Sequence, residues 1–269
     1  MSMIRPIPAL ELVAAEKIFA NGTRGLAPID LLVRPGEFVS LIGPSGCGKS
    51  TLLKLAANLL EPSDGRVQWW RGDFNRVGQA GRRIAFVFQE PTLMPWSRVL
   101  NNVRLPLDAG GVPRAEANER AMAALEQVGL AHVARHHPRE LSGGMRMRVS
   151  IARALVTEPD LLLMDEPFGA LDEFTRNRLD EDLAQLSRAR GLTTMFVTHS
   201  IYEAVFLSTR IVVMAAGPGR IFSTVPVDEP APRSQPFRDS ARFAELCRIL
   251  SQQLVEASMA SLSPATGRS

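Results

Sequence analysis

Short apolar runs alternate along the chain with longer segments in which apolar positions recur at the helical period. Short runs bounded by polar or glycine-rich residues predict buried strands, and the periodic segments predict helices that cover them. The predicted strands are Phe38 to Ile42, Ile84 to Phe88, Leu161 to Met164, Thr193 to Val197 and Ile211 to Met214. This alternation favours the α/β class, with a mostly parallel sheet between helices.

Polar or glycine-rich residues follow directly after all of these strands except the last. In an open α/β sheet the ligand crevice lies at the carboxyl ends of the strands. We therefore expect the loops after these strands to meet at one edge of the sheet.

Between Gln89 and Glu140 the strand pattern disappears and helical patterns replace it. In Ala115 to Val128, apolar side chains repeat at helical spacing. They are Ala117, Ala121, Met122, Leu125 and Val128. This block predicts a helical subdomain.

Both ends of the chain predict additions to the central sheet. Leu10 to Val33 and Val67 to Trp70 have the pattern of short antiparallel strands, with a turn at Asn21-Gly22. After Met214 the composition shifts to Pro, Ser and Gly, and a helix from Ala241 to Ala260 closes the chain. One face of this helix carries Phe243, Leu246, Cys247, Leu250 and Leu254.

Length, charge and cysteine content limit the class of protein. A chain of 269 residues suits one compact core with an inserted or appended subdomain. The formal charge of +3 is too small for nucleic acid or an anionic membrane to be the main partner. Two cysteines are too few for a disulfide framework, and they fit a reducing compartment.

The N-terminal region and the apolar runs argue against export and against membrane insertion. Glu11 and Glu16 stand where a signal peptide needs an apolar core. No apolar run approaches the roughly 18 residues that a membrane span requires. We expect a cytosolic chain or a peripheral one.

The segment GPSGCGKST follows one predicted strand and precedes a helical run, which is the context of a phosphate-binding loop. In such a loop, backbone N–H groups surround the α- and β-phosphates, Lys49 supplies a cation for the β- and γ-phosphates, and the Ser50 hydroxyl reaches Mg²⁺. The predicted nucleotide-binding residues are Gly43, Pro44, Ser45, Gly46, Cys47, Gly48, Lys49, Ser50 and Thr51. For Cys47 we favour a small tolerated side chain over a redox role.

Adjacent carboxylates, Asp165 and Glu166, end the predicted strand in LLLMDEP. Burying two unpaired acids is costly, so an ion or a reaction has to justify them. Asp165 is predicted to hold Mg²⁺ through water, and Glu166 to orient and polarise an attacking water. The alternative is an acidic helix cap.

The segment LSGG precedes a long basic and apolar helix pattern. Ser142, Gly143 and Gly144 can form an ordinary N-cap, or they can form an anion site at the helix N-terminus. The local sequence leaves both open.

Taken together, these motifs resemble the ATP-binding subunit of an ABC transporter. The resemblance rests on GPSGCGKST, Gln89 after a strand, LSGG before a helix, LLLMDEP, the ALD of Ala170 to Asp172, and His199 after the strand TTMFVT. It extends from about Leu12 to Ile221 in the family's order. It implies ATP and Mg²⁺ as cofactors. The implied fold is a P-loop NTPase (RecA-like) core with an antiparallel β subdomain and an inserted α-helical signature subdomain.

The resemblance also implies a division of the chain. Residues 1–222 would form the ATPase domain, with the core at approximately 10–90 and 156–222 and the helical subdomain at approximately 91–155. A Pro-rich linker and the C-terminal helix would take 223–269.

In proteins of this family two nucleotide-binding subunits meet head to tail, with each ATP between the phosphate loop of one and the signature of the other. The resemblance thus implies that Ser142, Gly143 and Gly144 contact, in trans, the γ-phosphate bound by the other subunit. Asp172 would lie in a loop that faces the same site.

Within one subunit the resemblance implies catalytic roles for Glu166, His199 and Gln89. His199 would donate a hydrogen bond to the γ-phosphate. Gln89 would contact Mg²⁺ or the attacking water and report the nucleotide state to the membrane subunit. Phe19 is predicted to stack on adenine, with a core Phe as the alternative.

A narrower resemblance is to ATPases of nitrate, sulfonate and taurine importers, a group that includes carriers of thiamine precursors. It is carried by LSGGM, VFQEPTLMPW and THSIYEAVFLSTRIVVMAAGPGRI. It implies a homodimer or a pair of ATPase subunits, transmembrane permease subunits and, indirectly, a periplasmic or extracellular solute-binding protein. The chain would lie, as a peripheral protein, on the cytoplasmic face of the cell membrane. Met145 replaces the usual Gln of the signature and has no hydrogen-bond donor.

The segment after Gln89 carries Leu93, Met94 and Trp96. An exposed apolar cluster there would mark the permease interface. Filling of the helical subdomain's own core is the alternative.

Other ATPase classes of the superfamily fit less well. DNA-repair and chromosome-organising ATPases usually contain a long coiled coil, and no sustained heptad pattern separates the phosphate loop from the signature. A two-motor translation factor needs a second phosphate loop. Lys49, Asp165, Glu166 and His199 argue against an adaptor that binds ATP without hydrolysing it. His136 and His137 have no nearby ligands at metal-binding spacing, which favours a solvated helix end.

Overall fold

The computed structural model describes residues 7–79, 81–169, 171–229 and 233–262. Its centre is a six-stranded sheet with the strand order β5-β6-β7-β3-β8-β9. The strands are β3 (Phe38–Ile42), β5 (Ile84–Val87), β6 (Leu161–Asp165), β7 (Thr193–Val197), β8 (Arg210–Ala215) and β9 (Arg220–Pro226). Neighbouring strands are parallel except β8 and β9, which are antiparallel. The predicted mostly parallel sheet is confirmed.

The sheet is apolar on both faces because helices cover both of them. Along β6, Leu162 and Met164 belong to one hydrophobic cluster, and Leu161 and Leu163 belong to the other. α1 (Lys49–Ala56) packs against β6 and β7, and α6 (Ile201–Leu207) packs against β3 and against α5 (Glu173–Ala189). The alternation of side chains along each strand thus divides the core between two faces.

A three-stranded antiparallel sheet with the order β2-β1-β4 adjoins this core. It contains β1 (Leu10–Ile18), β2 (Arg24–Val33) and β4 (Asp64–Trp69), as predicted. Asn21-Gly22 lies in the β1–β2 turn, where Gly22 has a φ of +80°. The buried Trp69 donates its Nε1–H to the Ala56 carbonyl at 2.8 Å, which ties this sheet to the end of α1.

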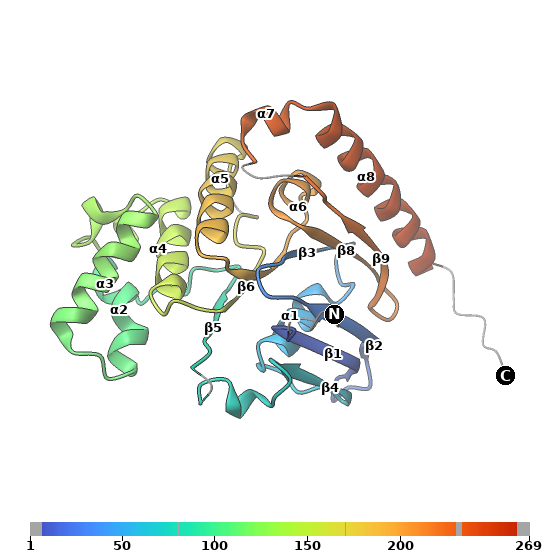
Figure 1. Cartoon of the computed structure of the whole chain (residues 1–269), viewed down its shortest axis with the longest axis horizontal. Helices are drawn as coiled ribbons and strands as arrows, with labels where there is room; N and C mark the ends of the chain where they lie inside the picture. The colour runs from blue at the N-terminus through green and yellow to red at the C-terminus, as the bar shows by residue number, and fades with distance from the viewer. Residues whose placement is uncertain (1–6, 80, 170, 230–232, 263–269) are drawn as a thin grey trace, which may run out of the picture.

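A helical lobe projects from the sheet on the side of β5 (Figure 1). Its helices are α2 (Val99–Ala109), α3 (Arg114–Gln127) and α4 (Gly143–Leu155). Single 3-10 turns at Ala131–Val133 and Pro138–Glu140 connect α3 to α4, and another lies at Phe74–Arg76. The predicted apolar face of α3 is buried at Ala117, Ala121 and Leu125. α4 contacts both α2 and β5, so it joins the lobe to the sheet.

The C-terminal part follows β9 with α7 (Gln235–Arg238) and α8 (Ala241–Leu262). α8 packs along α6 and β8 through Phe243, Leu246 and Leu250, and it covers one end of the sheet (Figure 1). β9 runs through residue 222, where we placed the end of the main domain. The division of the chain at that point remains a prediction.

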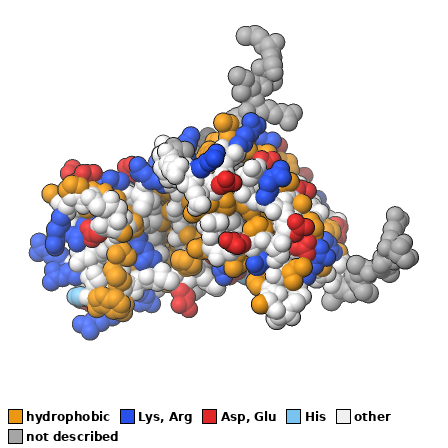
Figure 2. All heavy atoms as spheres, turned by 90° about the horizontal axis from the view of Figure 1, so that it is seen from below, with side chains coloured by type: hydrophobic (Ala, Val, Ile, Leu, Met, Phe, Trp, Pro, Cys, Tyr) orange, Lys and Arg blue, Asp and Glu red, His pale blue; other side chains and the backbone are white. Residues whose placement is uncertain are grey.

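The surface carries both signs of charge. Figure 2 shows acidic and basic side chains mixed over one face, with basic ones gathered at the outer end of the helical lobe. This mixture fits the small net charge of +3. Of the helices within the described ranges, none has the length and hydropathy needed to span a bilayer.

Candidate functional site

The strands β5, β6, β7 and β3 are neighbours and run in one direction, so the loops after them meet at one edge. A cavity of about 770 Å³ opens at this edge. It is lined by Phe19, Thr23, Arg24, Gly25, Ser45, Gly46, Gly48, Lys49, Ser50, Thr51, Gln89, Glu166, His199, Gly217, Pro218 and Gly219. The predicted convergence of the loops is confirmed.

The loop between β3 and α1 brings its backbone close to β2. Gly48 has a φ of +93°, and a Cβ atom there would lie 2.5 Å from Leu26 Cδ2. No side chain caps α1 at Gly48. The helix therefore presents its N-terminal N–H groups to the cavity, which is an arrangement that binds phosphate.

Lys49 is only 5% exposed, yet it lines this cavity. Its Nζ donates to the carbonyl of Gly43 at 2.8 Å and to that of Pro44 at 3.1 Å. Neutral carbonyls satisfy the donors without neutralising the charge. The ammonium is therefore a fixed cation at the phosphate loop.

Cys47 is fully buried beneath the loop, and burial raises the pKa of its thiol. A thiol that stays protonated is a poor nucleophile. This placement supports the interpretation of Cys47 as a small packing residue.

Ser50 and Asp165 approach each other across the site although 115 positions separate them in sequence. The Ser50 hydroxyl donates to Asp165 Oδ1 at 2.8 Å. Asp165 is 8% exposed. The structure thus places a hydroxyl and a carboxylate together beside the phosphate loop, and the oxygen atoms of both groups can act as metal ligands.

Glu166 occupies a strained position at the end of β6, with a φ of +46°. Its N–H donates to the Val197 carbonyl at 3.0 Å, which holds the backbone against β7. Its Oε1 lies 2.5 Å from His199 Nε2, and its Oε2 accepts a hydrogen bond from Gln89 Nε2 at 3.4 Å. Side chains from the two neighbouring loops, Gln89 after β5 and His199 after β7, therefore meet the carboxylate of Glu166.

Phe19 lies on the turn after β1, is 37% exposed and lines the same cavity. Gly25 is the reason that the ring fits, since a Cβ there would lie 2.5 Å from Phe19 Cε2. The ring is therefore placed at the cavity rather than in the core. Its role against adenine remains a prediction.

The residues predicted to act in trans cap two helices. The Ser142 hydroxyl accepts the N–H of Met145 at 3.2 Å at the start of α4. Asp172 accepts the N–H of Thr175 at 3.0 Å at the start of α5, and this bond lowers the pKa of the Asp172 carboxyl. In one chain, therefore, the signature has the form of an ordinary N-cap.

These residues form a group of their own, which we call the signature group: Ser142, Gly143, Gly144 and Asp172. Gly144 packs against the start of α5, where a Cβ would lie 3.1 Å from Thr175 Cγ2. None of the four lines the cavity that contains Lys49. Ala170, which precedes this part of α5, lies outside the described residues. The predicted site residues thus divide into two separate surfaces.

Two residues behind His199 were not identified from the sequence. Glu203 on α6 is 3% exposed and accepts a hydrogen bond from the Thr198 hydroxyl. Arg176 on α5 lies with its Nε 3.3 Å from Glu203 Oε1. The spacing of Ser200 and Glu203 at a helix start resembles a capping box, and that signal could have marked the carboxylate.

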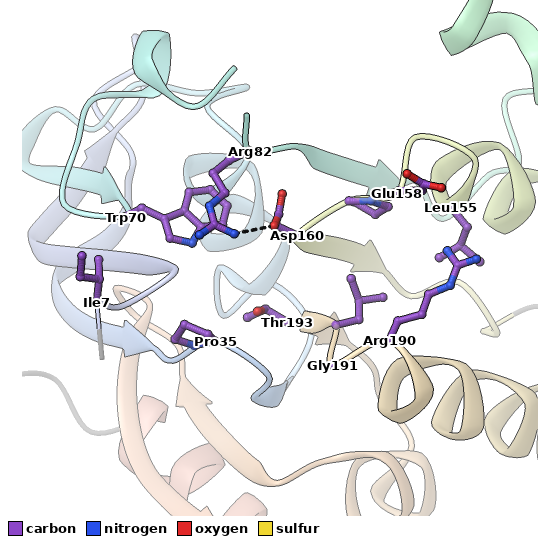
Figure 3. Close-up of a pocket in the computed structure, with 12 residues that line it drawn as sticks. Ile7, Pro35, Trp70, Arg82, Leu155, Glu158, Asp160, Arg190, Gly191 and Thr193 are labelled. Carbon is purple, nitrogen blue, oxygen red and sulfur yellow. Dashed lines mark hydrogen bonds and ion pairs between the residues drawn. The ribbon is translucent and has the colours of Figure 1, made fainter. Parts of the chain in front are cut away.

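A larger cavity, of about 900 Å³, lies at the opposite edge of the sheet, beside the starts of β6 and β7 (Figure 3). Arg82 lies over the Trp70 ring at 5.5 Å and pairs with Asp160 at 2.7 Å. Arg190 at the far wall donates to Gln127 Oε1 at 2.8 Å. These charged side chains already have partners, so size alone does not make this cavity the functional site.

Comparison with known proteins settles the family. The model of the ABC transporter family matches residues 26–169. The chain belongs to the ABC transporter family. It is 43% identical to the aliphatic sulfonates import ATP-binding protein SsuB of Bacillus licheniformis over 230 residues, which cover 84% of this chain and 88% of that one. It is 46% identical to the taurine import ATP-binding protein TauB of Rhizobium johnstonii over 214 residues, which cover 78% of this chain and 80% of that one.

Solved structures agree with this assignment. The dimeric structure of the bacterial ABC transporter cassette MJ0796 aligns with a TM-score of 0.73 at 33% identity, over 82% of this chain and 100% of that one. A post-hydrolysis dimer of the same cassette, bound to ADP and Pi, aligns with a TM-score of 0.71. The predictions of a P-loop NTPase fold, of an ATP-binding ABC ATPase coupled to transport, and of a resemblance to sulfonate and taurine importers are confirmed.

Proposed function

We propose that two copies of this ABC ATPase close head to tail around two ATP molecules and so drive solute import through a membrane permease. The observation that carries the proposal is the division of the site. The cavity with Lys49, Glu166 and His199 lies on one surface, and the signature group lies on another. A second copy would bring its signature group to the first copy's cavity.

Aromatic side chains are exposed near the edge of the sheet where the cavity opens, and this exposure supports a partner protein that covers them. Phe88 is 39% exposed directly before Gln89, and Phe174 is 83% exposed two positions after Asp172. Large exposed rings of this kind are typical of a surface that another protein covers. The head-to-tail dimer would cover both of these segments.

After the dimer has closed, the bond-breaking step would use side chains of one copy's cavity. Lys49 and the N-terminus of α1 would hold the phosphates. Glu166 would accept the proton of a water whose oxygen bonds to the γ-phosphorus, while the bond from that phosphorus to the β–γ bridging oxygen breaks and ADP leaves. His199 would donate to the γ-phosphate, and its contact with Glu166 would fix both side chains.

Mg²⁺ fits the donor set on this edge. Ser50 Oγ and Asp165 Oδ1 lie 2.8 Å apart, and both are oxygen ligands of the kind that Mg²⁺ prefers. Gln89 lies at the same edge of the sheet, where its amide contacts Glu166. When bound, the ion would neutralise charge on the phosphate oxygens. Ser50, Asp165 and Gln89 would be the residues that hold it.

The permease would dock beside Gln89, on the loop that ends at Trp96. Trp96 is 77% exposed, whereas Leu93 is partly buried and packs against the hydrophobic cluster that includes the buried side chains of the helical lobe. Arg153 donates to the Pro91 and Thr92 carbonyls, at 3.0 and 2.9 Å, and holds the start of this loop. A rigid loop with one exposed indole would carry movement between Gln89 and a membrane partner, with the chain on the cytoplasmic face of the membrane.

The solute would be a sulfonate, taurine or a related anion such as nitrate, because the named relatives import sulfonates and taurine. Import of a thiamine precursor is the alternative within the group. Proteoliposomes that contain the full chain and its permease would test this. We expect ATP-driven uptake of taurine or an alkanesulfonate, together with a solute-binding protein, and no uptake with Glu166→Gln. Uptake of a thiamine precursor alone would select the alternative.

A further inference from the structure

His199 is held in place by a buried carboxylate from the helix that follows it. Glu203 accepts a hydrogen bond from the Thr198 hydroxyl, and its own N–H donates to Ser200 Oγ at 3.3 Å. Thr198 Oγ1 also accepts the N–H of Ser200 at 2.9 Å. Glu203 therefore fixes the residues on both sides of His199.

Arg176 joins this loop to the segment that carries Asp172. Its Nε lies 3.3 Å from Glu203 Oε1, and one Nη donates to the Leu171 carbonyl at 2.8 Å. Leu171 directly precedes Asp172 in the chain. One guanidinium thus contacts both Glu203, which holds the loop of His199, and the segment that carries Asp172.

The contact between Arg176 and Glu203 places a cation beside a buried carboxylate. Burial raises the pKa of Glu203, and the negative charge of Glu166 acts in the same direction. The Thr198 hydroxyl and the charges of Arg176 and Arg238 oppose this shift. A carboxylate that is 3% exposed needs such partners, and Arg176 is one of them.

We propose that Arg176 is a positioning residue for ATP hydrolysis, because it couples the position of His199 in one cavity to the position of Asp172 on the surface that meets the partner. The inference rests on the proposed function, in which Asp172 faces the other subunit's nucleotide. When a second copy presses on the Asp172 segment, Arg176 carries the displacement to Glu203 and to the loop of His199. Hydrolysis at one site thereby depends on closure at the other.

The first test is Arg176→Met in the full chain, which keeps an unbranched apolar stem and removes the guanidinium that makes both contacts. We expect kcat to fall about 10- to 100-fold, because small misplacements of catalytic groups have effects of this size. The Kd for ATP, measured by equilibrium binding, should not change, because Arg176 does not line the nucleotide cavity. Arg178→Met is the matched control, since Arg178 is exposed on the same helix. A wild-type kcat for Arg176→Met would overturn the inference.

A double-mutant cycle separates coupling from a structural role. Asp172→Ala is measured for kcat in the wild-type background and in the Arg176→Met background. If Arg176 transmits the position of Asp172, Asp172→Ala should lower kcat by a smaller factor in the Arg176→Met background than in the wild-type background. Equal losses in the two backgrounds would contradict the coupling.

Arg176→Met leaves Glu203 without one of its cations, so the variant can fail to fold. Arg176→Met/Glu203→Gln removes both charges, retains an acceptor for Thr198 and should fold. It should still have a low kcat, since the contact with the Leu171 carbonyl is lost; a wild-type kcat in this variant would also overturn the inference. Glu166→Gln separates failure of this inference from failure of the proposed function. Normal ATP hydrolysis by Glu166→Gln would show that the proposed function is wrong. Normal hydrolysis by the Arg176 variants, with hydrolysis lost in Glu166→Gln, would show that only this inference is wrong.

Discussion

Glu166 Oε1 lies 2.5 Å from His199 Nε2, so residues that follow two neighbouring strands bring a carboxylate and an imidazole into contact. Glu166 adopts a φ of +46° at this position, and its N–H donates to the Val197 carbonyl at the end of β7. Gln89 donates to the other carboxylate oxygen at 3.4 Å. An acid that is strained, held by a histidine and placed beside a phosphate loop is suited to activate water.

Replacement of this carboxylate should stop hydrolysis without stopping binding. We expect Glu166→Gln to lower ATP turnover by roughly 10² to 10⁴, the range for loss of a general base. The amide keeps the size of the side chain, so the Kd for ATP should stay near the wild-type value, and an ATP-bound dimer should accumulate. Steady-state phosphate release and size-exclusion chromatography measure the two effects. Glu119→Gln, on an exposed helix face of the lobe, is the control, and a folded Glu166→Gln protein with full turnover would refute the assignment.

The aromatic wall of the cavity makes a separate prediction. Phe19→Ala should weaken ATP binding by about 1 to 3 kcal/mol, the range for loss of stacking on one base. Binding of inorganic tripolyphosphate should not change, because that ligand has no base. Titration calorimetry with both ligands measures the difference. An equal loss for both would show that Phe19 supports the loop rather than the adenine.

The exposed indole of Trp96 should matter only in the complex. Trp96→Ala should weaken association with the permease by about 2 kcal/mol or more, as for an aromatic hot spot. Basal ATPase activity of the isolated chain should stay close to wild type. Leu59→Ala, a change at an exposed apolar side chain on another part of the molecule, serves as the control. Undiminished transport by reconstituted Trp96→Ala would rule out this docking site.

Asp180 predicts a pH dependence of stability. Burial and the charge of Glu203 raise the pKa of Asp180 to about 8, against the nearby charges of Arg238 and Arg176. The unfolded chain loses this proton near pH 4 and the folded chain near pH 8, so the contribution of Asp180 to stability falls as the pH rises between these values. Asp180→Asn cannot titrate, and its Tm should therefore gain on the wild-type Tm from pH 5 to pH 8. Parallel Tm curves across this range would contradict the raised pKa of Asp180.

Many residues of the cavity that contains Lys49 could be predicted from the sequence, because they directly follow the apolar runs that form the strands. Strand periodicity located β3, β5, β6 and β7, and the rule that ligands bind at carboxyl ends placed Lys49, Glu166 and His199 together. The rule needs only the order of polar residues after each run, which the sequence contains.

Other features depend on tertiary contacts between distant segments. Arg176 has the spacing of an ordinary polar helix position, and only the packing of α5 on α6 brings it to Glu203. Leu93 and Trp96 have similar local patterns, yet Leu93 packs against a hydrophobic cluster and Trp96 is exposed. Which apolar side chain faces solvent depends on the helices that surround it, and periodicity cannot determine that for a loop.

The central claim is that each ATP site combines the cavity of one copy with the signature group of the other. The most direct test is Ser142→Arg, with ATP binding and hydrolysis measured in the same preparation. The structure caps α4 with Ser142 away from the cavity of its own chain, so the Kd for ATP of the isolated chain should not change. Hydrolysis should be lost, because the larger cation obstructs closure of the dimer, whereas Ser258→Arg on the exposed face of α8 should remain active. Loss of ATP binding in the Ser142→Arg monomer, or full hydrolysis by that variant, would contradict the account.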